Sequence, residues 1–141
     1  MEQRNMLAIL IGPPGSGKST FCKNNLFNCL RISQDDQGKV GHMDLFKKAI
    51  EDKVENIVID RMNFNKQQRN KYLSLIPKDY LIVFYLFLPS KDVCLKRIEG
   101  RKDHPTLGMD KAEEVINFFH KSYEAPTLDE AKIIIHVEDK I

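Results

Sequence analysis

Short apolar runs alternate with helical patterns along the whole chain. The apolar runs predict buried strands at Met6–Ile11, Asn28–Ser33, Ile57–Asp60, Leu81–Leu88 and Ala131–Val137. Apolar positions at helical spacing predict helices at Lys18–Leu26, Gly41–Lys53, Lys66–Ile76, Ser90 (as N-cap) to about Glu99, and Met109–Tyr123. This alternation is typical of a doubly wound α/β domain, with a parallel sheet of about five strands and helices on both faces.

The first apolar run ends in a glycine-rich segment that matches the phosphate-binding pattern G-x-x-x-x-G-K-[ST]. A strand before it and a helix after it are the context that this P-loop requires. Backbone N–H groups of such a loop surround phosphates, the lysine contacts the β- and γ-phosphates, and the hydroxyl ligates Mg²⁺. The sequence therefore predicts a P-loop NTPase-type site for ATP or GTP with Mg²⁺. The site comprises Gly12, Pro13, Pro14, Gly15, Ser16, Gly17, Lys18, Ser19 and Thr20.

Carboxylates follow two of the other predicted strands. Asp60 ends a β-branched strand, where P-loop enzymes hold Mg²⁺ with an aspartate; a surface residue at a strand end is the alternative. Asp35 and Asp36 follow the second strand, and either can accept the proton of an acceptor alcohol. The spacing alone leaves open whether the pair belongs to a turn or helix cap instead. If this backbone is extended, the two side chains point apart and only one faces the acceptor.

Basic residues gather before the glycine-containing loop that follows Glu99, which predicts a small lid over residues 97–108. In a helix, Arg97 and Arg101 are four residues apart and share a face. Arginine stabilises the charge that spreads over phosphoryl oxygens during transfer, so both are candidates for contacting the nucleotide. The alternative is a solvated basic helix end.

Composition narrows the classes of protein that fit. The 141 residues have a net charge of +2, with 42% hydrophobic and 30% charged residues, so we expect one globular domain over residues 1–141 and no nucleic-acid-coating function. The three cysteines form no C-x-x-C pair, which predicts neither a disulfide framework nor a zinc site. The apolar runs are too short for a signal peptide or a membrane span. We therefore expect a cytoplasmic or nuclear protein that is not secreted and contacts no membrane.

A GTPase switch protein is a further alternative, and two motifs argue against it. Asp35–Gly38 satisfies D-x-x-G, but Lys39 follows it where a water-positioning glutamine is needed. Asn65 and Lys66 begin like the guanine-binding N-K-x-D motif, but Gln68 stands at the position of its aspartate.

The chain resembles the polynucleotide 5′-hydroxyl kinases, in particular the kinase domain of polynucleotide kinase 3′-phosphatase and the kinase module of fungal tRNA ligases. The segments that carry the resemblance are Gly12–Thr20, Ser33–Gly38, Ile59–Tyr72 and Tyr123–Glu130. Three positions depart from the family pattern. Gly38 stands where bacteriophage-type members have an arginine, and eukaryotic-type members also have a glycine there. Gln37 replaces a leucine of the family, and Ala131 replaces a glycine.

The resemblance implies roles for individual residues. It favours Asp35 over Asp36 as the general base and makes Arg101 the lid arginine that clamps the phosphates, so that the implied catalytic residues are Lys18, Asp35 and Arg101. The implied acceptor-binding residues are Asp35, Arg61, Asn63 and Arg69. The base of the nucleotide is expected between the lid and the loop at Pro126 and Thr127.

These features together predict transfer of the γ-phosphoryl group of a nucleoside triphosphate to the 5′-OH end of DNA or RNA, as in nucleic acid repair. A separate phosphatase or ligase chain is an expected partner, because no D-x-D-x-[TV] phosphatase signature is present. Two alternatives stay open. One is a small-metabolite kinase acting on a sugar or nucleoside, and the other is a regulatory module that binds a nucleotide without transferring phosphate.

Overall fold

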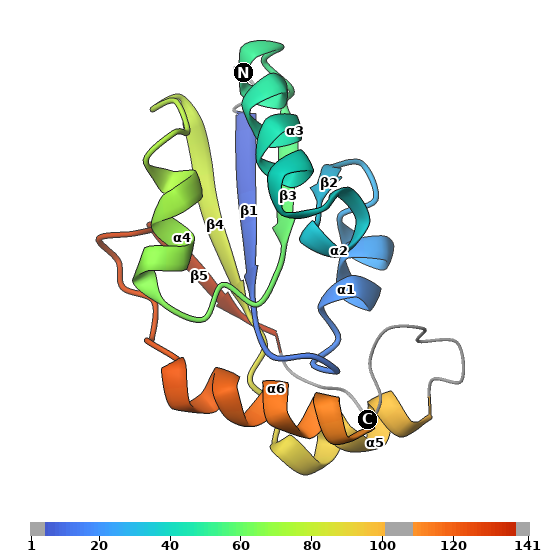
Figure 1. Cartoon of the computed structure of the whole chain (residues 1–141). Coiled ribbons are helices and arrows are strands. Elements are labelled where there is room, and N and C mark those ends of the chain that lie inside the picture. Colours follow the sequence, from blue (N-terminus) through green and yellow to red (C-terminus); the bar gives the residue numbers. More distant parts are fainter. Residues whose placement is uncertain (1–4, 101–108, 138–141) are drawn as a thin grey trace.

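The computed structural model describes residues 5–100 and 109–137 (Figure 1). Five parallel strands lie in the order β2-β3-β1-β4-β5, with bounds β1 Asn5–Ile11, β2 Leu30–Ile32, β3 Asn56–Asp60, β4 Tyr80–Leu86 and β5 Ile133–His136. The helices are α1 Lys18–Asn25, α2 Gln34–Gln37, α3 Lys39–Glu51, α4 Lys66–Leu73, α5 Lys91–Glu99 and α6 Met109–Ser122. The predicted fold class is confirmed, and the predicted strands differ from the observed ones only at their ends.

The centre of the sheet is covered on both faces. β1 is fully buried from Leu7 to Ile11, as expected for a central parallel strand. The helix residues that cover it include Phe46, Tyr72 and Phe119 on one face and Cys22 and Leu26 on the other. α5 packs against α6, and both helices lie beyond the carboxyl ends of the strands (Figure 1). No helix within the described ranges is long and apolar enough to cross a membrane.

The strand register brings three separate segments to one edge of the sheet. Leu10 of β1 lies opposite Asp60 of β3, and Ile32 of β2 lies opposite Ile59. Because the strands are parallel, their carboxyl ends meet at this edge. The glycine-rich loop after β1, the α2 segment after β2 and Asp60 are therefore neighbours in space.

The segment after β2 is helical, so the condition of an extended backbone at Asp35 and Asp36 is not met. Both residues lie in α2, a short helix that Gly38 ends with a φ of 83°. The side chain of Gln37 holds α2 to the end of β2. Its Oε1 accepts from the Ser33 amide at 2.7 Å, and its Nε2 donates to the Arg31 carbonyl at 3.2 Å. A leucine at position 37 could make neither bond.

A buried charge joins α4 to the segment before β5. Arg69 is 0% exposed and pairs with Glu130, with 2.7 Å between Nε and Oε1. Its two Nη groups donate to the carbonyl oxygens of Asn63 and Glu124, each at 3.0 Å. Burial opposes ionisation of Glu130, but the hydrogen bonds from Arg69 and the Thr127 amide outweigh it, and the pKa of Glu130 is lowered.

The first prediction concerns this pair. Glu130→Gln should lower the free energy of unfolding at neutral pH by about 3 kcal/mol, because it leaves the buried arginine charge without its partner. The native pKa of Glu130 lies below its ordinary value of 4.5, so the pair contributes fully above that pH. Its contribution is then lost as the pH falls through the lowered native value. Urea unfolding of the parent protein and of Glu130→Gln should be measured from neutral pH to about pH 3. The difference between their free energies of unfolding should become smaller as the pH falls.

Asp52→Asn is the matched control, because Asp52 follows the last residue of α3 and pairs there with Lys48, and both side chains are exposed. This substitution should lower the free energy of unfolding by less than about 1 kcal/mol. Equal costs for the two variants would contradict a special contribution of the buried pair.

Candidate functional site

The glycine-rich loop has a backbone that only glycine adopts easily at two positions. Gly15 has a φ of 77° and Gly17 a φ of 97°. A Cβ atom on Gly15 would lie 2.6 Å from the Cys94 carbonyl oxygen, so α5 packs directly on the loop. Gly17 is the N-cap of α1, and the positive end of that helix dipole therefore faces the loop.

Two basic side chains contact this loop from different elements. Lys18 Nζ donates to the Pro13 carbonyl at 2.8 Å and lies 3.4 Å from Ser16 Oγ, which holds the amine over the loop. Arg97 of α5 donates to the Gly15 carbonyl at 3.1 Å. The loop therefore combines backbone N–H groups, a helix N-terminus and two cations, which is a strong environment for phosphates.

A hydroxyl and a carboxylate oxygen lie next to each other beside the loop. Ser19 Oγ donates to Asp60 Oδ2 at 3.2 Å, and Asp60 is only 6% exposed. These hard oxygen donors suit Mg²⁺, which is bound in P-loop sites by few protein groups together with phosphate oxygens and water. Within the described residues, no group of three or more His, Cys, Asp or Glu is placed so that it could hold a metal ion by itself. Ser19 and Asp60 thus fit the predicted metal site.

Arg31, on β2, links the two acidic groups of the site and was not predicted from the sequence. Its Nε donates to Asp60 Oδ2 at 2.9 Å, its Nη2 lies 2.7 Å from the same oxygen in an ion pair, and its Nη1 contacts Asp36. Burial opposes the charge of Arg31, but Asp60 and Asp36 outweigh it and raise its pKa. The sequence feature that could have indicated this role is a charged residue between Leu30 and Ile32 in a predicted strand. A charge that is partly buried in a sheet needs a charged partner nearby.

The two carboxylates of α2 differ in their surroundings. Asp36 is engaged by Arg31. Asp35 is exposed and lines the cleft beside the loop, and its carboxylate makes no hydrogen bond or ion pair within the described part of the chain. Asp35 is therefore the one of the two that can accept a proton from a molecule in this cleft.

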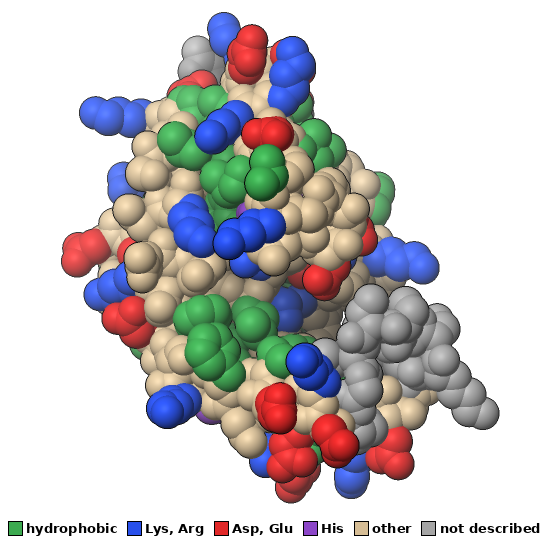
Figure 2. All heavy atoms as spheres, in the orientation of Figure 1, with side chains coloured by type: hydrophobic (Ala, Val, Ile, Leu, Met, Phe, Trp, Pro, Cys, Tyr) green, Lys and Arg blue, Asp and Glu red, His purple; other side chains and the backbone are tan. Residues whose placement is uncertain are grey.

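A cleft of about 370 Å³ brings together residues that were predicted from separate segments. Those that line it include Lys18, Ser19, Asp35, Asp60, Arg61 and Asn63. Figure 2 shows a hollow on this face, with acidic and basic side chains at its edge and a group of hydrophobic side chains beside it. We call the cleft with this lining the acceptor cleft, after the predicted acceptor-binding residues Asp35, Arg61 and Asn63 that it contains.

A second cleft, of about 760 Å³, lies on the other side of the loop. Its lining includes Ser16, Gly17, Thr20, Asn24, Phe87 and Arg97. Gly17 belongs to the lining of both clefts, so the loop separates two binding spaces that meet at its centre.

Arg61 and Asn63 line the acceptor cleft but also have structural contacts. Arg61 Nη1 donates to Tyr72 Oη at 2.8 Å, which uses one of the five guanidinium N–H groups. Asn63 has a φ of 47°, and its Nδ2 donates to the Leu10 carbonyl at 2.7 Å. Asn63 Oδ1 is buried and is the one buried side-chain polar atom without a hydrogen-bond partner in the described ranges.

Three predicted site residues lie away from both clefts. Arg69 is fully buried and engaged with Glu130 and backbone carbonyls, so the structure does not support its predicted contact with the acceptor. The Thr127 amide donates to Glu130 at 3.0 Å, which holds the loop containing Pro126 beside α4 (Figure 1). Pro126 and Thr127 line neither cleft, and the position of the nucleotide base between this loop and the lid stays a prediction. Arg101, with lid residues 101–108, lies outside the described residues.

A cysteine nucleophile does not fit this site. Burial and the nearby Asp60 carboxylate raise the pKa of Cys22 to about 11, and burial also raises the pKa of Cys29. The thiolate is the nucleophilic form of cysteine, and a raised pKa lowers the fraction of thiolate near neutral pH.

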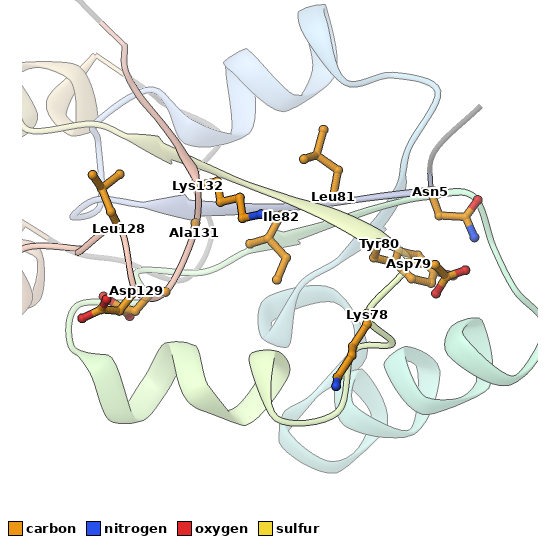
Figure 3. Close-up of a pocket in the computed structure, with 11 residues that line it drawn as sticks. Asn5, Lys78, Asp79, Tyr80, Leu81, Ile82, Leu128, Asp129, Ala131 and Lys132 are labelled. Atoms are coloured by element: carbon orange, nitrogen blue, oxygen red, sulfur yellow. The ribbon is translucent and has the colours of Figure 1, made fainter. Parts of the chain in front are cut away.

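Another cavity, of about 900 Å³, lies at the opposite end of the sheet (Figure 3). Its lining includes Asn5 and Tyr80, at the starts of β1 and β4, and Asp129 in the segment before β5. The charged side chains in Figure 3 point in different directions rather than toward one point. Because this cavity lies at the starts of the strands, it is separate from the site at their carboxyl ends.

Comparison of the sequence with known proteins finds one partial similarity. No known family profile matches the chain. The chain is 33% identical over 140 residues to a protein of Arabidopsis thaliana named transcription factor bHLH140, covering 92% of this chain and 15% of that protein. The chain thus spans less than a fifth of the length of this relative.

Two solved structures share the architecture over nearly the whole chain. A fungal RNA kinase superposes with a TM-score of 0.72 and 20% identity, covering 100% of this chain and 78% of that one. A sugar kinase from Janibacter sp. HTCC2649 superposes with a TM-score of 0.68 and 14% identity, covering 94% and 85%. The chain therefore has the fold of P-loop kinases. Because that fold occurs in kinases named for RNA and for sugar, the acceptor has to be inferred from the site.

The second prediction tests the packing of α5 on the glycine-rich loop. Gly15→Ala should lower the free energy of unfolding by at least about 1–2 kcal/mol, the cost of a left-handed backbone for a residue with a Cβ. The 2.6 Å contact with the Cys94 carbonyl adds to that cost. Chemical denaturation of both proteins measures the difference.

Gly41→Ala adds the same methyl group at a permissive position. Gly41 lies inside α3, and its added Cβ would meet only the Gln37 side chain, at 3.8 Å. This variant should be more stable than the parent by about 0.5–1 kcal/mol. Stabilisation by Gly15→Ala as well would contradict the described loop conformation.

Proposed function

We propose that this chain transfers the γ-phosphoryl group of a nucleoside triphosphate to the 5′-hydroxyl end of a polynucleotide. The observation that carries the proposal is the pair of clefts that meet at Gly17, one of which contains Asp35, a carboxylate without a partner among the described residues. Two spaces on either side of a phosphate-binding loop suit a donor nucleotide and an acceptor in line with the transferred group.

The donor side follows from the loop and its neighbours. Backbone N–H groups, Lys18 and the N-terminus of α1 would bind the phosphates, and Ser19 and Asp60 would hold Mg²⁺. When bound, Mg²⁺ neutralises charge on the phosphate oxygens. The nucleoside occupies the larger cleft beside Thr20 and Asn24, and Arg97 reaches the phosphates from α5. Arg101 is proposed to add a second cation there, on the basis of the family resemblance.

The acceptor side follows from Asp35. Its carboxylate accepts the proton of the attacking hydroxyl as the new oxygen–phosphorus bond forms. The bond from the γ-phosphorus to the bridging oxygen breaks, and the nucleoside diphosphate leaves with that oxygen. Arg31 keeps Asp36 engaged and thereby leaves Asp35 as the base.

Cations in the acceptor cleft favour a polynucleotide over a neutral sugar. Arg61 lines the cleft and retains N–H groups beyond its bond to Tyr72. Arginine suits the phosphates of a nucleic-acid strand, whereas a sugar hydroxyl needs only neutral hydrogen-bond partners. The resemblance of four ordered segments to the polynucleotide kinases supports the same acceptor.

Direct transfer assays test the proposal. The protein is incubated with γ-labelled ATP or GTP and Mg²⁺, and with 5′-OH DNA or RNA oligonucleotides, matched 5′-phosphorylated oligonucleotides, sugars or nucleosides. Label on the 5′-OH oligonucleotides and not on the 5′-phosphorylated ones is expected. Label on a sugar or nucleoside instead would identify a small-metabolite kinase, and no transfer to any acceptor would identify a nucleotide-binding module.

The third prediction is that Lys18→Ala slows transfer on the order of 10²-fold or more, because a charge that stabilises the transferring group is lost. The rate is measured in single turnover with excess enzyme. Lys23→Ala is the control, since Lys23 is exposed on the same helix and should leave the rate unchanged. A normal rate for Lys18→Ala would remove the basis of the proposed donor site.

The fourth prediction compares the two carboxylates of α2. Asp35→Asn should keep donor binding within a few-fold and slow transfer on the order of 10²–10⁴-fold, the contribution of a positioned general base. Asp36→Asn should slow it much less, because Asp36 contacts Arg31 and not the cleft. Donor affinity is measured by titration and transfer by single turnover. A larger effect of Asp36→Asn would reverse the assignment.

A further inference from the structure

Two aromatic side chains from distant segments form a ledge beside the acceptor cleft. The rings of Phe64, in the loop after β3, and Phe118, in α6, are 5.1 Å apart between centroids and meet edge to face at 79°. Phe64 is half-buried and lines the acceptor cleft, whereas Phe118 is 51% exposed. Val115 lies one turn before Phe118 on α6 and lines the same cleft. We call Phe64, Val115 and Phe118 the aromatic ledge.

The aromatic ledge is continuous with the site rather than an isolated exposed side chain. Figure 2 shows hydrophobic side chains gathered beside the hollow, in the region of α6. Two of the three ledge residues share the cleft lining with Asp35, so a molecule that reaches Asp35 also reaches the ledge. When the hydroxyl of an acceptor lies at Asp35, the group attached to that hydroxyl contacts this apolar surface.

The backbone beneath the ledge is held in place. The Glu124 amide donates to the Phe64 carbonyl at 2.7 Å, and Arg69 donates to the carbonyl of Asn63 at 3.0 Å. The Lys66 amide adds a bond to the Glu124 side chain at 3.3 Å. These bonds fix Phe64 relative to the end of α6, so the ledge is preorganised and a ligand does not have to order it.

We infer that the aromatic ledge stacks the nucleobase at the 5′ end of the acceptor strand. This inference rests on the proposed function and adds the recognition of the terminal base to it. Every nucleobase has a flat π-face that stacks on aromatic side chains, while a free sugar has none. Lys111 lies one turn before Val115 on α6, and Arg61 lines the cleft, so cations flank the ledge. Aromatic surface beside cations is typical of sites for single-stranded nucleic acid.

A pair of oligonucleotides isolates this contact. Both carry a 5′-OH group and the same sequence, but one has an abasic sugar at its 5′ terminus. The parent protein should use the abasic oligonucleotide with a kcat/KM lower by about 5- to 100-fold, the range found for one base stacked on an aromatic side chain. Phe118→Ala should use both oligonucleotides at similar, reduced rates, and Phe118→Trp should restore the preference for the base.

A binding measurement provides a readout besides activity. With 2-aminopurine as the 5′-terminal base, addition of the parent protein should quench the fluorescence by stacking, and Phe118→Ala should abolish most of the quenching. Phe27→Ala is the control, because Phe27 is 81% exposed in the turn after α1 and does not line the acceptor cleft. Circular dichroism before and after heating establishes that each variant folds, as expected for a half-exposed position.

The outcomes separate the inference from the proposed function. Efficient transfer to both oligonucleotides at equal rates by the parent protein would overturn the ledge as a base-binding surface and leave the 5′-hydroxyl kinase intact. Transfer to small alcohols but to neither oligonucleotide would overturn both. A preference for the base that survives Phe118→Ala would place the base elsewhere and overturn the inference alone.

Discussion

A guanidinium group shielded from water requires hydrogen-bond acceptors for its N–H groups, and Arg69 finds them in two segments, the loop after β3 and the connection between α6 and β5. Glu130 neutralises its charge, and the carbonyl groups of Asn63 and Glu124 complete its hydrogen bonds. Leaving such a group unpaired costs several kcal/mol, so the segments it joins have little freedom to separate. The buried arginine thereby fixes the wall of the acceptor cleft that carries Phe64.

A second arginine organises the opposite wall. Arg31 of β2 contacts both Asp60 of β3 and Asp36 of α2, and the side chain of Gln37 holds α2 to the end of β2. The consequence for chemistry is a division of roles among three carboxylates. Asp60 stays next to Ser19, Asp36 is neutralised by Arg31, and Asp35 alone faces the cleft without a partner within the described residues.

The parallel sheet explains why these walls enclose a single site. Each parallel strand ends at the same edge, so the loops that follow β1, β2 and β3 collect there whatever their separation in sequence. α5 and α6 lie beyond that edge and contribute Arg97 and Phe118. A phosphate-binding loop between two clefts is then a geometric result of the fold, while the choice of acceptor depends on the side chains placed around it.

The sequence by itself determined the elements and the phosphate-binding loop, because both depend on local spacing. A strand, a glycine-rich turn and a helix in succession leave the backbone few alternatives, and the strand pattern at Asp60 fixed the position of that carboxylate. Only the tertiary structure decided the partners of the charged side chains. Arg31 meets Asp60 across 29 positions and Arg69 meets Glu130 across 61, distances over which no local pattern acts. For the same reason, the burial of Arg69 against Glu130 and the contact between Phe64 and Phe118 became visible only once the helices were packed against the sheet.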